Sequence, residues 1–248
     1  MARTRHIPRV HLAAALAVGD EIALPDDKRH HLSTVLRLAA GAELRLFNGD
    51  GAEYDATLIA SDRKQAIARI DRRTTPAGES PLAVTLVQAI ARGDRMDFAL
   101  AKAVELGVTA IQPVFTERGQ VKLDGARLAK KQAHWQRVVE SAAEQSGRLS
   151  CPALTEAAEL RSIIAAPPAA DRYLMLAPEA AGGLSTLAPA HEVALLIGPE
   201  SGLSNDEIET AAAAGWQALA LGPRVLRTET AGMAALAALQ TVWGDLAG

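Results

Sequence analysis

Two glycine–proline segments carry the residues whose types and spacing best suit the binding of a ligand. The first, Gly198-Pro-Glu-Ser-Gly202, follows the apolar run 193–197 and precedes a helix start at Ser204. The second, Leu221-Gly222-Pro223, follows another strand-like run and precedes a helix start at Thr228. Ligands of α/β proteins usually bind at loops that follow the carboxyl ends of sheet strands. We therefore expect the two loops to face one crevice, with plain connecting loops as the alternative.

The residues of the first loop limit the kind of ligand. The chain contains neither G-x-x-x-x-G-K-[ST] nor G-x-G-x-x-G, the two glycine patterns that cradle phosphates. The carboxylate of Glu200 would repel a phosphate but suits hydroxyl groups or a positive centre. A serine hydrolase is not expected, because G-x-S-x-G around Ser201 needs glycine where Pro199 and Leu203 stand.

Two arginines and a carboxylate, Arg224, Arg227 and Glu229, lie in the segment that joins the second loop to its helix. Glu229 in the first turn could simply compensate the helix dipole. A cation is unfavourable at the same place, so Arg227 is expected to have a role beyond stability. The helix itself is predicted from the apolar spacing of Gly232, Leu236, Leu239 and Trp243.

The clearest break in the chain is the segment 74–81, where two prolines and a glycine interrupt both periodicities. We predict a domain boundary there, with a small β domain over 1–75 and an α/β domain over 76–248. The first domain is expected to contain a hairpin, a third strand and a short helix. The hairpin joins 43–47 to 53–59 around Asn48-Gly-Asp-Gly51, the third strand covers 65–70, and the helix covers 26–38.

After the break, strand-like and helical patterns alternate, which is typical of a mostly parallel sheet covered by helices on both faces. A capping box formed by Ser204 and Glu207, with a hydrophobic staple of Leu203 and Ile208, marks one helix start. The predicted strands cover 82–90, 108–115, 173–176, 193–197 and 217–221, and two further helices cover 94–106 and 124–146.

Composition excludes several classes of protein. The 248 residues contain 49% hydrophobic and 22% charged residues, as ordinary globular domains do. The single cysteine, Cys151, cannot form an internal disulfide, and the six histidines show no metal-ligand spacing, so no metal is expected. Arg3, Arg5 and Arg9 before the apolar run 12–18 imitate an export signal, but Pro8 and Asp20-Glu21 interrupt the pattern, and we expect a cytoplasmic protein.

Charge is unevenly distributed along the chain. Residues 1–75 carry 12 basic and 10 acidic residues, residues 76–150 carry 10 and 8, and residues 151–248 carry 4 and 11. The first 150 residues are therefore the candidate surface for a polyanion, with an ordinary solvated surface as the alternative. Capture of a nucleic acid would depend on local arginines.

The two loop segments belong to longer motifs that resemble a known family. Leu196-Ile-Gly-Pro-Glu-x-Gly-Leu-Ser204 and Leu221-Gly-Pro-Arg-Val-Leu-Arg-Thr-Glu-Thr-Ala231 are similar to motifs of the bacterial 16S ribosomal RNA uridine-N3 methyltransferases of the SPOUT superfamily. The resemblance extends over almost the whole chain. It includes Gln88-x-x-x-Arg92-Gly93-x-x-Met96, Lys102-x-x-Glu105-Leu106-Gly107, Glu144-Gln145-x-Gly147-Arg148, Ile7-Pro8-Arg9 and His31-Leu-x-x-Val-Leu-Arg37.

The resemblance implies a fold, a cofactor and a reaction. The fold would be a small PUA-like β-barrel followed by an α/β domain with a SPOUT-type trefoil knot, assembled as a homodimer without membrane or metal. S-adenosylmethionine would be the methyl donor, and N3 of uridine 1498 in the 16S ribosomal RNA of the small subunit would be the acceptor. A ligand with a sulfonium cation and no phosphate agrees with the loop composition. The cofactor would lie against Leu196, Ile197, Gly198, Glu200, Gly202, Leu221, Gly222 and Leu226.

The resemblance also implies roles for charged residues. Arg227 would stabilise the anion that develops at uracil N3 near the methyl-transfer centre, and Glu229 would act either as a base or as a brace for Arg227. Arg92, Glu144, Gln145 and Arg148 would position RNA or the base, and Arg9 and Arg37 would meet phosphates. The target base would be splayed out of its RNA context to reach the crevice.

One departure from the family pattern and two alternative functions stay open. Ser201 stands where the family usually has a second glycine, which puts cofactor affinity in doubt if the position needs a positive φ. A knotted ribose 2′-O-methyltransferase would carry the same glycine loops. A ribosome assembly factor that binds RNA without catalysis is the alternative from a different class.

Overall fold

The chain forms two compact units in the computed structural model, which describes residues 7–76, 78–180 and 182–247. The first unit consists of residues 1–79 together with 143–151, and the second of residues 80–142 and 152–248. Residues 143–151 thus join the first unit although the long helix whose end they include begins in the second. Arg3 and Arg5 lie outside the described residues.

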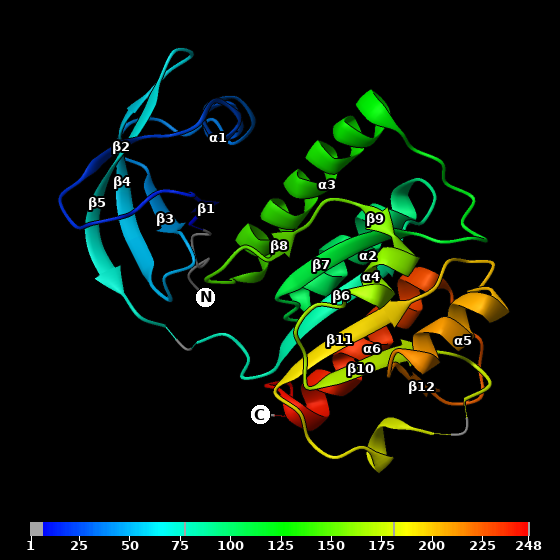
Figure 1. Cartoon of the computed structure of the whole chain (residues 1–248). Coiled ribbons are helices and arrows are strands. Elements are labelled where there is room, and N and C mark those ends of the chain that lie inside the picture. Colours follow the sequence, from blue (N-terminus) through cyan, green and yellow to red (C-terminus); the bar gives the residue numbers. More distant parts are fainter. Residues whose placement is uncertain (1–6, 77, 181, 248) are drawn as a thin grey trace. The chain divides into compact units, whose positions relative to one another are not determined.

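The first unit is built on a five-stranded mixed sheet in the order β1-β3-β4-β5-β2 (Figure 1). The strand β1 pairs in parallel with β3, and the other neighbours are antiparallel. Its elements are β1 (Arg9–His11), β2 (Glu21–Ala23), the short helix α1 (Asp26–His30) that continues as a π-helical turn η1 (His31–Val35), β3 (Glu43–Phe47), β4 (Glu53–Ser61) and β5 (Ala66–Thr74).

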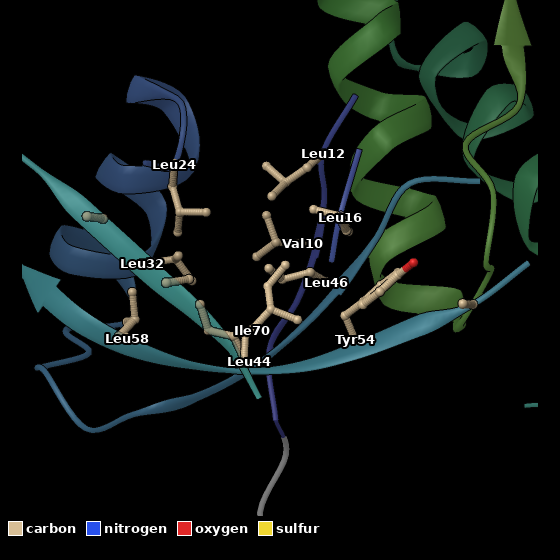
Figure 2. Packing of buried hydrophobic residues seen from close by; sticks show 14 residues of the cluster. Val10, Leu12, Leu16, Leu24, Leu32, Leu44, Leu46, Tyr54, Leu58 and Ile70 are labelled. Atoms are coloured by element: carbon tan, nitrogen blue, oxygen red, sulfur yellow. The ribbon is translucent and has the colours of Figure 1, made fainter. Parts of the chain in front are cut away.

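Alternate residues of these strands form the core of the first unit (Figure 2). Leu44 and Leu46 of β3 and Tyr54 and Leu58 of β4 point into it, as expected for strands with one buried face. Leu32 of η1 packs against the same core. Leu12 and Leu16, two residues of the apolar run that imitates an export signal, are buried in this core, whereas the other residues of the run are exposed.

The second unit is built on a parallel sheet in the order β12-β10-β11-β6-β7-β8, with β9 also paired to β7. Its strands are β6 (Ala83–Ala89), β7 (Ala110–Phe115), β8 (Ala153–Leu154), β9 (Ala158–Glu159), β10 (Arg172–Leu176), β11 (Glu192–Ile197) and β12 (Gln217–Leu219). Its helices are α2 (Asp94–Glu105), α3 (Gly125–Ser146, whose last residues belong to the first unit), α4 (Leu160–Ala165), the 3₁₀ turn η2 (Leu184–Thr186), α5 (Asn205–Ala213) and α6 (Thr228–Trp243).

Helices cover both faces of this sheet (Figure 1). Leu160 and Ile164 of α4 and Ala211 of α5 share a buried cluster with Val87 and Leu196 of the central strands. The helix α6 packs against β6, β11 and α2 on the other face. Because both faces are covered, the central strands are apolar without alternation, as β11 is over five consecutive buried residues.

The sequence predicted most of these elements. The hairpin of β3 and β4, the long helix that stops before Gly147, and the helix starts at Ser204 and Thr228 are confirmed. The helix predicted over 26–38 ends at Val35 in a π-turn. The sequence analysis missed β1, β2, β8, β9 and α4, which are at most six residues long and show little periodicity. Among the described residues, no helix is both long and apolar enough to cross a bilayer.

Candidate active site

The two glycine–proline loops lie at the carboxyl edge of the parallel sheet. The first leaves β11 at Gly198 and ends at Ser204, the N-cap of α5, whose capping box with Glu207 is formed as predicted. The second leaves β12 and runs into α6. Gly202 has a φ of +72° and Gly222 a φ of +75°, so each loop turns through a left-handed conformation that glycine adopts without strain.

Thr228 joins the two loops. Its hydroxyl donates to the carbonyl oxygen of Gly198 over 2.7 Å and lies 3.1 Å from the amide nitrogen of Gln88, which donates to it. Thr228 and Gln88 are both buried, so the hydrogen bond between them is shielded from water, and the bond to Gly198 is partly buried. Thr228, the first residue of α6, therefore holds Gly198, the residue where the loop after β11 begins, in place. The sequence analysis assigned neither residue this role.

The apolar residues predicted for the cofactor site fall into two groups. Leu196 and Ile197 are buried in β11, and Leu196 is paired with both neighbouring strands, so they position the loop. Leu221 and Leu226 are partly exposed in the second loop. Ligand contacts by all four residues stay predictions.

Charged residues cluster at the start of α6. Arg227 is the N-cap residue, its side chain is exposed, and it has no ionic or hydrogen-bonded partner among the described residues. The side chain of Glu229 is only 12% exposed, and its Oε2 atom is buried without a hydrogen-bond partner. The orphaned Oε2 atom of Glu229 is costly in a resting protein and is suited to a polar ligand.

Arg95, in the first turn of α2, lies between two carboxylates. Its Nη1 atom is 3.1 Å from Glu200 Oε1, and its Nε atom is 4.0 Å from Glu229 Oε1. Arg95 thus links the loop after β11 to the start of α6. This role was not predicted from the sequence, although Arg95 lies inside the motif between Arg92 and Met96.

Ser201 ties the first loop to the loop that follows β7. Its hydroxyl donates to the carbonyl oxygen of Arg118 over 2.6 Å, and Arg118 donates back to the carbonyl oxygen of Leu203. The hydroxyl of Ser204 also donates to the Glu117 carboxylate. The φ of Ser201 is not positive, so a residue with a side chain fits there without backbone strain. Arg92, which is exposed, donates to Gln120 of the same loop.

A third loop, of which the structure describes residues 177–180 and 182–183, is bonded to the same edge of the sheet. Ala177 donates its amide hydrogen to the carbonyl of Leu219, and Ala220 donates to the carbonyl of Gly182. The sequence analysis left this segment unassigned. Pro178, two residues after the predicted strand 173–176, and the Gly182-Gly183 pair could have indicated a loop here.

Arg9, predicted to meet phosphate, is engaged within the first unit. Its donors reach Glu53 and the carbonyl oxygens of Ala143, Glu144 and Arg148, and its guanidinium lies 4.7 Å from the centre of the Phe47 ring. Its side chain is 11% exposed. This bonding holds the end of α3 to the sheet, and it does not favour the predicted phosphate contact.

Glu144 and Arg148 take part in the same connection. The Glu144 carboxylate accepts from the amide of His11 and from Lys28, while Arg148 is buried against Glu79. Both therefore have structural partners that the sequence did not reveal. Gln145 and Arg37 are exposed, and neither side chain has a bonded partner in the described part of the chain. Their RNA contacts stay predictions.

No group of three or more histidine, cysteine, aspartate or glutamate side chains converges within residues 7–76, 78–180 and 182–247. The acids of the site, Glu200 and Glu229, are instead arranged around the guanidinium of Arg95.

Comparison with known families defines the class. A family described as the RNA methyltransferase domain matches residues 78–240, and one described as the RNA methyltransferase PUA domain matches residues 24–71. The chain is therefore an RNA methyltransferase with an N-terminal PUA-like domain and a SPOUT-type, trefoil-knotted α/β domain.

Individual relatives narrow the class to one family. The ribosomal RNA small subunit methyltransferase E of Mycobacterium bovis is 35% identical and covers 86% of this chain and 83% of its own. The enzyme of the same name from Neisseria gonorrhoeae, solved with S-adenosylmethionine, has a TM-score of 0.91 at 43% identity over 97% of this chain and 100% of its own. A methyltransferase from Legionella pneumophila, solved with the same molecule, has a TM-score of 0.93 at 38% identity over 97% and 100%. The chain belongs to the ribosomal RNA small subunit methyltransferase E family.

Proposed function

We propose that this enzyme transfers a methyl group from S-adenosylmethionine to N3 of uridine 1498 in the 16S ribosomal RNA of the small subunit. The observation that carries the proposal is the connection through Thr228, which brings both motif loops and the start of α6 to one edge of the sheet. The Neisseria and Legionella relatives, whose structures hold S-adenosylmethionine, support the choice of donor.

The residues of the site fit this donor. Gly198 and Gly222 present backbone at the loops, as adenine and ribose recognition requires, and phosphate-binding residues are not needed. Glu200 and Glu229 bring two carboxylates to a site meant for a molecule with a sulfonium and an ammonium group. The buried, unpartnered Oε2 of Glu229 gives one of them a free acceptor. When bound, the cofactor supplies an electrophilic methyl group.

Arg227 has the central chemical role in this mechanism. Uracil N3 carries a weakly acidic proton, and nucleophilic attack requires negative charge to develop on the ring. The exposed guanidinium of Arg227 has no bonded partner among residues 7–76, 78–180 and 182–247, and it can donate to a uracil carbonyl oxygen and stabilise that charge. Its N-cap position on α6 places it directly beside the Thr228 connection, and therefore at the donor loops.

Glu229 has two alternative roles in this mechanism, as the base that accepts the N3 proton or as a brace that holds Arg227. As the base, its free Oε2 would accept the N3 proton. As a brace, it would hold Arg227 in line once the ligand is bound. Arg95 counters the charge of Glu229 and Glu200 in both cases and keeps the two loops at a fixed separation.

Exposed side chains are the candidates for RNA contact. Arg37 and Gln145 have no bonded partner in the described part of the chain, and Arg92 is bonded only to the side chain of Gln120. Arg37, with its left-handed φ of +54°, and Gln145 lie on the first unit, and Arg92 lies beside the site of the second. Arg9, Glu144 and Arg148 are assigned the structural connection described above. We keep residues 75 and 76 as the proposed end of the RNA-binding domain and start of the methyltransferase domain along the chain.

We also propose a homodimer in the cytoplasm. The helices α2 and α6 pack side by side, and each exposes a large apolar side chain, Phe98 at 44% and Val242 at 56%. A homodimer interface over this pair of helices would bury both side chains. A cytoplasmic location follows from the proposed ribosomal substrate.

One assay separates this function from its alternatives. The purified protein is incubated with labelled S-adenosylmethionine and small ribosomal subunits that lack the modification. Transfer to N3 blocks Watson–Crick pairing and stops reverse transcription at the modified uridine, which is the expected result. Transfer to a ribose 2′-hydroxyl would instead give resistance to alkali, and an assembly factor without catalysis would transfer no label. Either of these two results would contradict the proposal.

A further inference from the structure

The helix α3 carries a row of basic side chains that the proposed mechanism does not use. Four of them, Arg127, Lys130, Lys131 and Arg137, are exposed, and we refer to these four as the α3 basic ridge. The stretch 125–139 contains these four lysines and arginines and no aspartate or glutamate. Its charge is therefore +4 in a chain whose net charge is −3.

The four side chains lie on one side of the helix. At about 100° per residue, they fall within an arc of roughly 120°, while the buried Trp135 and Val139 lie outside that arc. From Arg127 to Arg137 the ridge is about 15 Å long, at about 1.5 Å per residue. That length is enough to meet several successive phosphates of one strand.

Helix stability does not explain the ridge. Arg127 is three and four residues from Lys130 and Lys131, and like charges at these spacings repel. Arg127 is also in the first turn, where a cation opposes the helix dipole. In contrast, several exposed arginines elsewhere, such as Arg72 and Arg161, are paired with aspartates. Arg127, Lys130 and Lys131 have no such partner within the part of the chain that the structure describes.

The ridge is continuous with the edge of the active site. The loop 116–124 leads directly from β7 into α3 and is bonded to the first cofactor loop through Ser201 and Arg118. The same loop carries Gln120, the partner of Arg92, and then the exposed Lys122. The loop carries two basic residues, Arg118 and Lys122, and two acidic residues, Glu117 and Asp124, and the α3 basic ridge begins at Arg127, three residues after it.

We infer that the α3 basic ridge binds the phosphodiester backbone of the RNA next to the target nucleotide. This inference rests on the proposed function, because it assumes that an RNA strand enters the site. Lysine and arginine side chains without protein partners on one helix face can each contact a phosphate of the RNA backbone. Such contacts do not depend on the base sequence. The ridge would thereby orient the strand, while the active site selects the base.

The test removes two charges from the ridge and compares the result with a matched control. The variant Lys130→Gln/Lys131→Gln is set beside Arg161→Gln/Arg172→Gln, which removes two charges from exposed or partly exposed positions elsewhere in the second unit. Binding of a labelled single-stranded RNA is measured by fluorescence anisotropy over a series of salt concentrations. Methylation of small subunits is measured in parallel, and S-adenosylmethionine affinity serves as the check on folding.

We expect the ridge variant to bind the RNA about five- to tenfold more weakly and to lose about 1.4 from the slope of log affinity against log salt, at about 0.7 per phosphate contact. The KM for subunits should rise while kcat and cofactor affinity are unchanged. The control should match the parent protein.

Three outcomes would overturn the inference. Parent-like salt dependence in the ridge variant would show that these lysines meet no phosphate, and an equal loss in the control would show that only total charge matters. Normal binding of free RNA with weakened binding of the subunit would assign the ridge to a ribosomal protein instead. If the parent binds RNA but transfers no methyl group, the proposed function fails, and the salt dependence still decides the role of the ridge.

Discussion

Arg227 and Glu229 show how single residues depart from what stability alone would select. A guanidinium at a helix N-cap lacks favourable electrostatics, and a buried carboxylate oxygen without a donor is costly. Both departures occur within three residues of each other, at the start of α6. Strain of this kind concentrates at functional sites, because the ligand supplies the missing partners.

Replacement of Arg227 by alanine should abolish methyl transfer without unfolding the protein. The side chain is exposed and makes no bond that the fold needs, so the melting temperature should change little. We expect kcat to fall at least about 100-fold, the size of effect seen when a group that stabilises developing charge is removed. Steady-state methylation of small subunits measures this.

Arg224→Ala is the matched control, because Arg224 is an exposed arginine of the same loop three residues earlier. It should keep most of the kcat of the parent. Near-normal activity in Arg227→Ala would remove Arg227 from the mechanism.

At the scale of elements, the sequence predicted the strands and helices that position the site but not the bonds between them. The capping box at Ser204, the stop at Gly147 and the glycine turns follow from local rules, and the structure has them. The link from Thr228 to Gly198 and Gln88 joins residues 30 and 140 positions apart in the chain. No local pattern in the sequence could reveal this link, because it depends on how α6 packs against β6 and β11.

The Thr228 connection should stabilise the second unit measurably. Thr228→Val keeps the shape of the side chain but leaves the part-buried Gly198 carbonyl and the buried Gln88 amide without this partner, at a cost of about 1–3 kcal/mol. That corresponds to a fall in melting temperature of about 3–10 °C, measured by calorimetry. Affinity for S-adenosylmethionine should fall as well, because the two loops are released from each other.

Thr241→Val on the same helix is the control. Thr241 is exposed and donates only to the Ala237 carbonyl of its own helix, so its loss should shift the unfolding free energy by less than about 0.5 kcal/mol. An equal effect of the two substitutions would argue against a special role for the Thr228 link.

The hairpin of the first unit should show a defined pH dependence. The Tyr54 hydroxyl donates to Asp50 over 2.6 Å, which lowers the pKa of Asp50 and raises the pKa of Tyr54. A lowered carboxyl pKa gives stability that is present above about pH 4 and is lost as pH falls through the folded-state value. A raised phenol pKa gives stability that is present below about pH 10 and is lost as pH rises further.

Tyr54→Phe should therefore destabilise the protein between about pH 4 and pH 10 and match the parent outside that range. The effect should be about 1 kcal/mol or less, because water competes for the exposed Asp50. Urea unfolding at a series of pH values measures it. A stability difference that is constant down to pH 2 would show that the hydrogen bond is not the cause.

At the scale of the whole molecule, the resemblance predicted more than periodicity could. Alternating strands and helices indicate a parallel sheet but not a knot, and the assignment of residues 143–151 to the first unit depends on Arg9, Glu144 and Arg148. Those three residues were predicted to meet RNA because they stand in motifs. The structure gives each of them partners inside the protein, which a motif alone cannot distinguish from a ligand.

The proposed homodimer gives a prediction at this scale. Phe98→Glu and Val242→Asp place charges on the outer sides of α2 and α6, where an interface would bury them at high cost. Light scattering after gel filtration should give twice the chain mass of 26.0 kDa for the parent and a monomer for the double variant. A monomeric parent protein would contradict the homodimer.

Titration calorimetry of the purified protein with S-adenosylmethionine, and with its demethylated product, tests the central claim most directly. The account predicts saturable binding of both molecules at one site per chain. The absence of heat from either molecule, with RNA present or absent, would contradict the assignment of the 198–204 and 221–227 loops as the methyl-donor site.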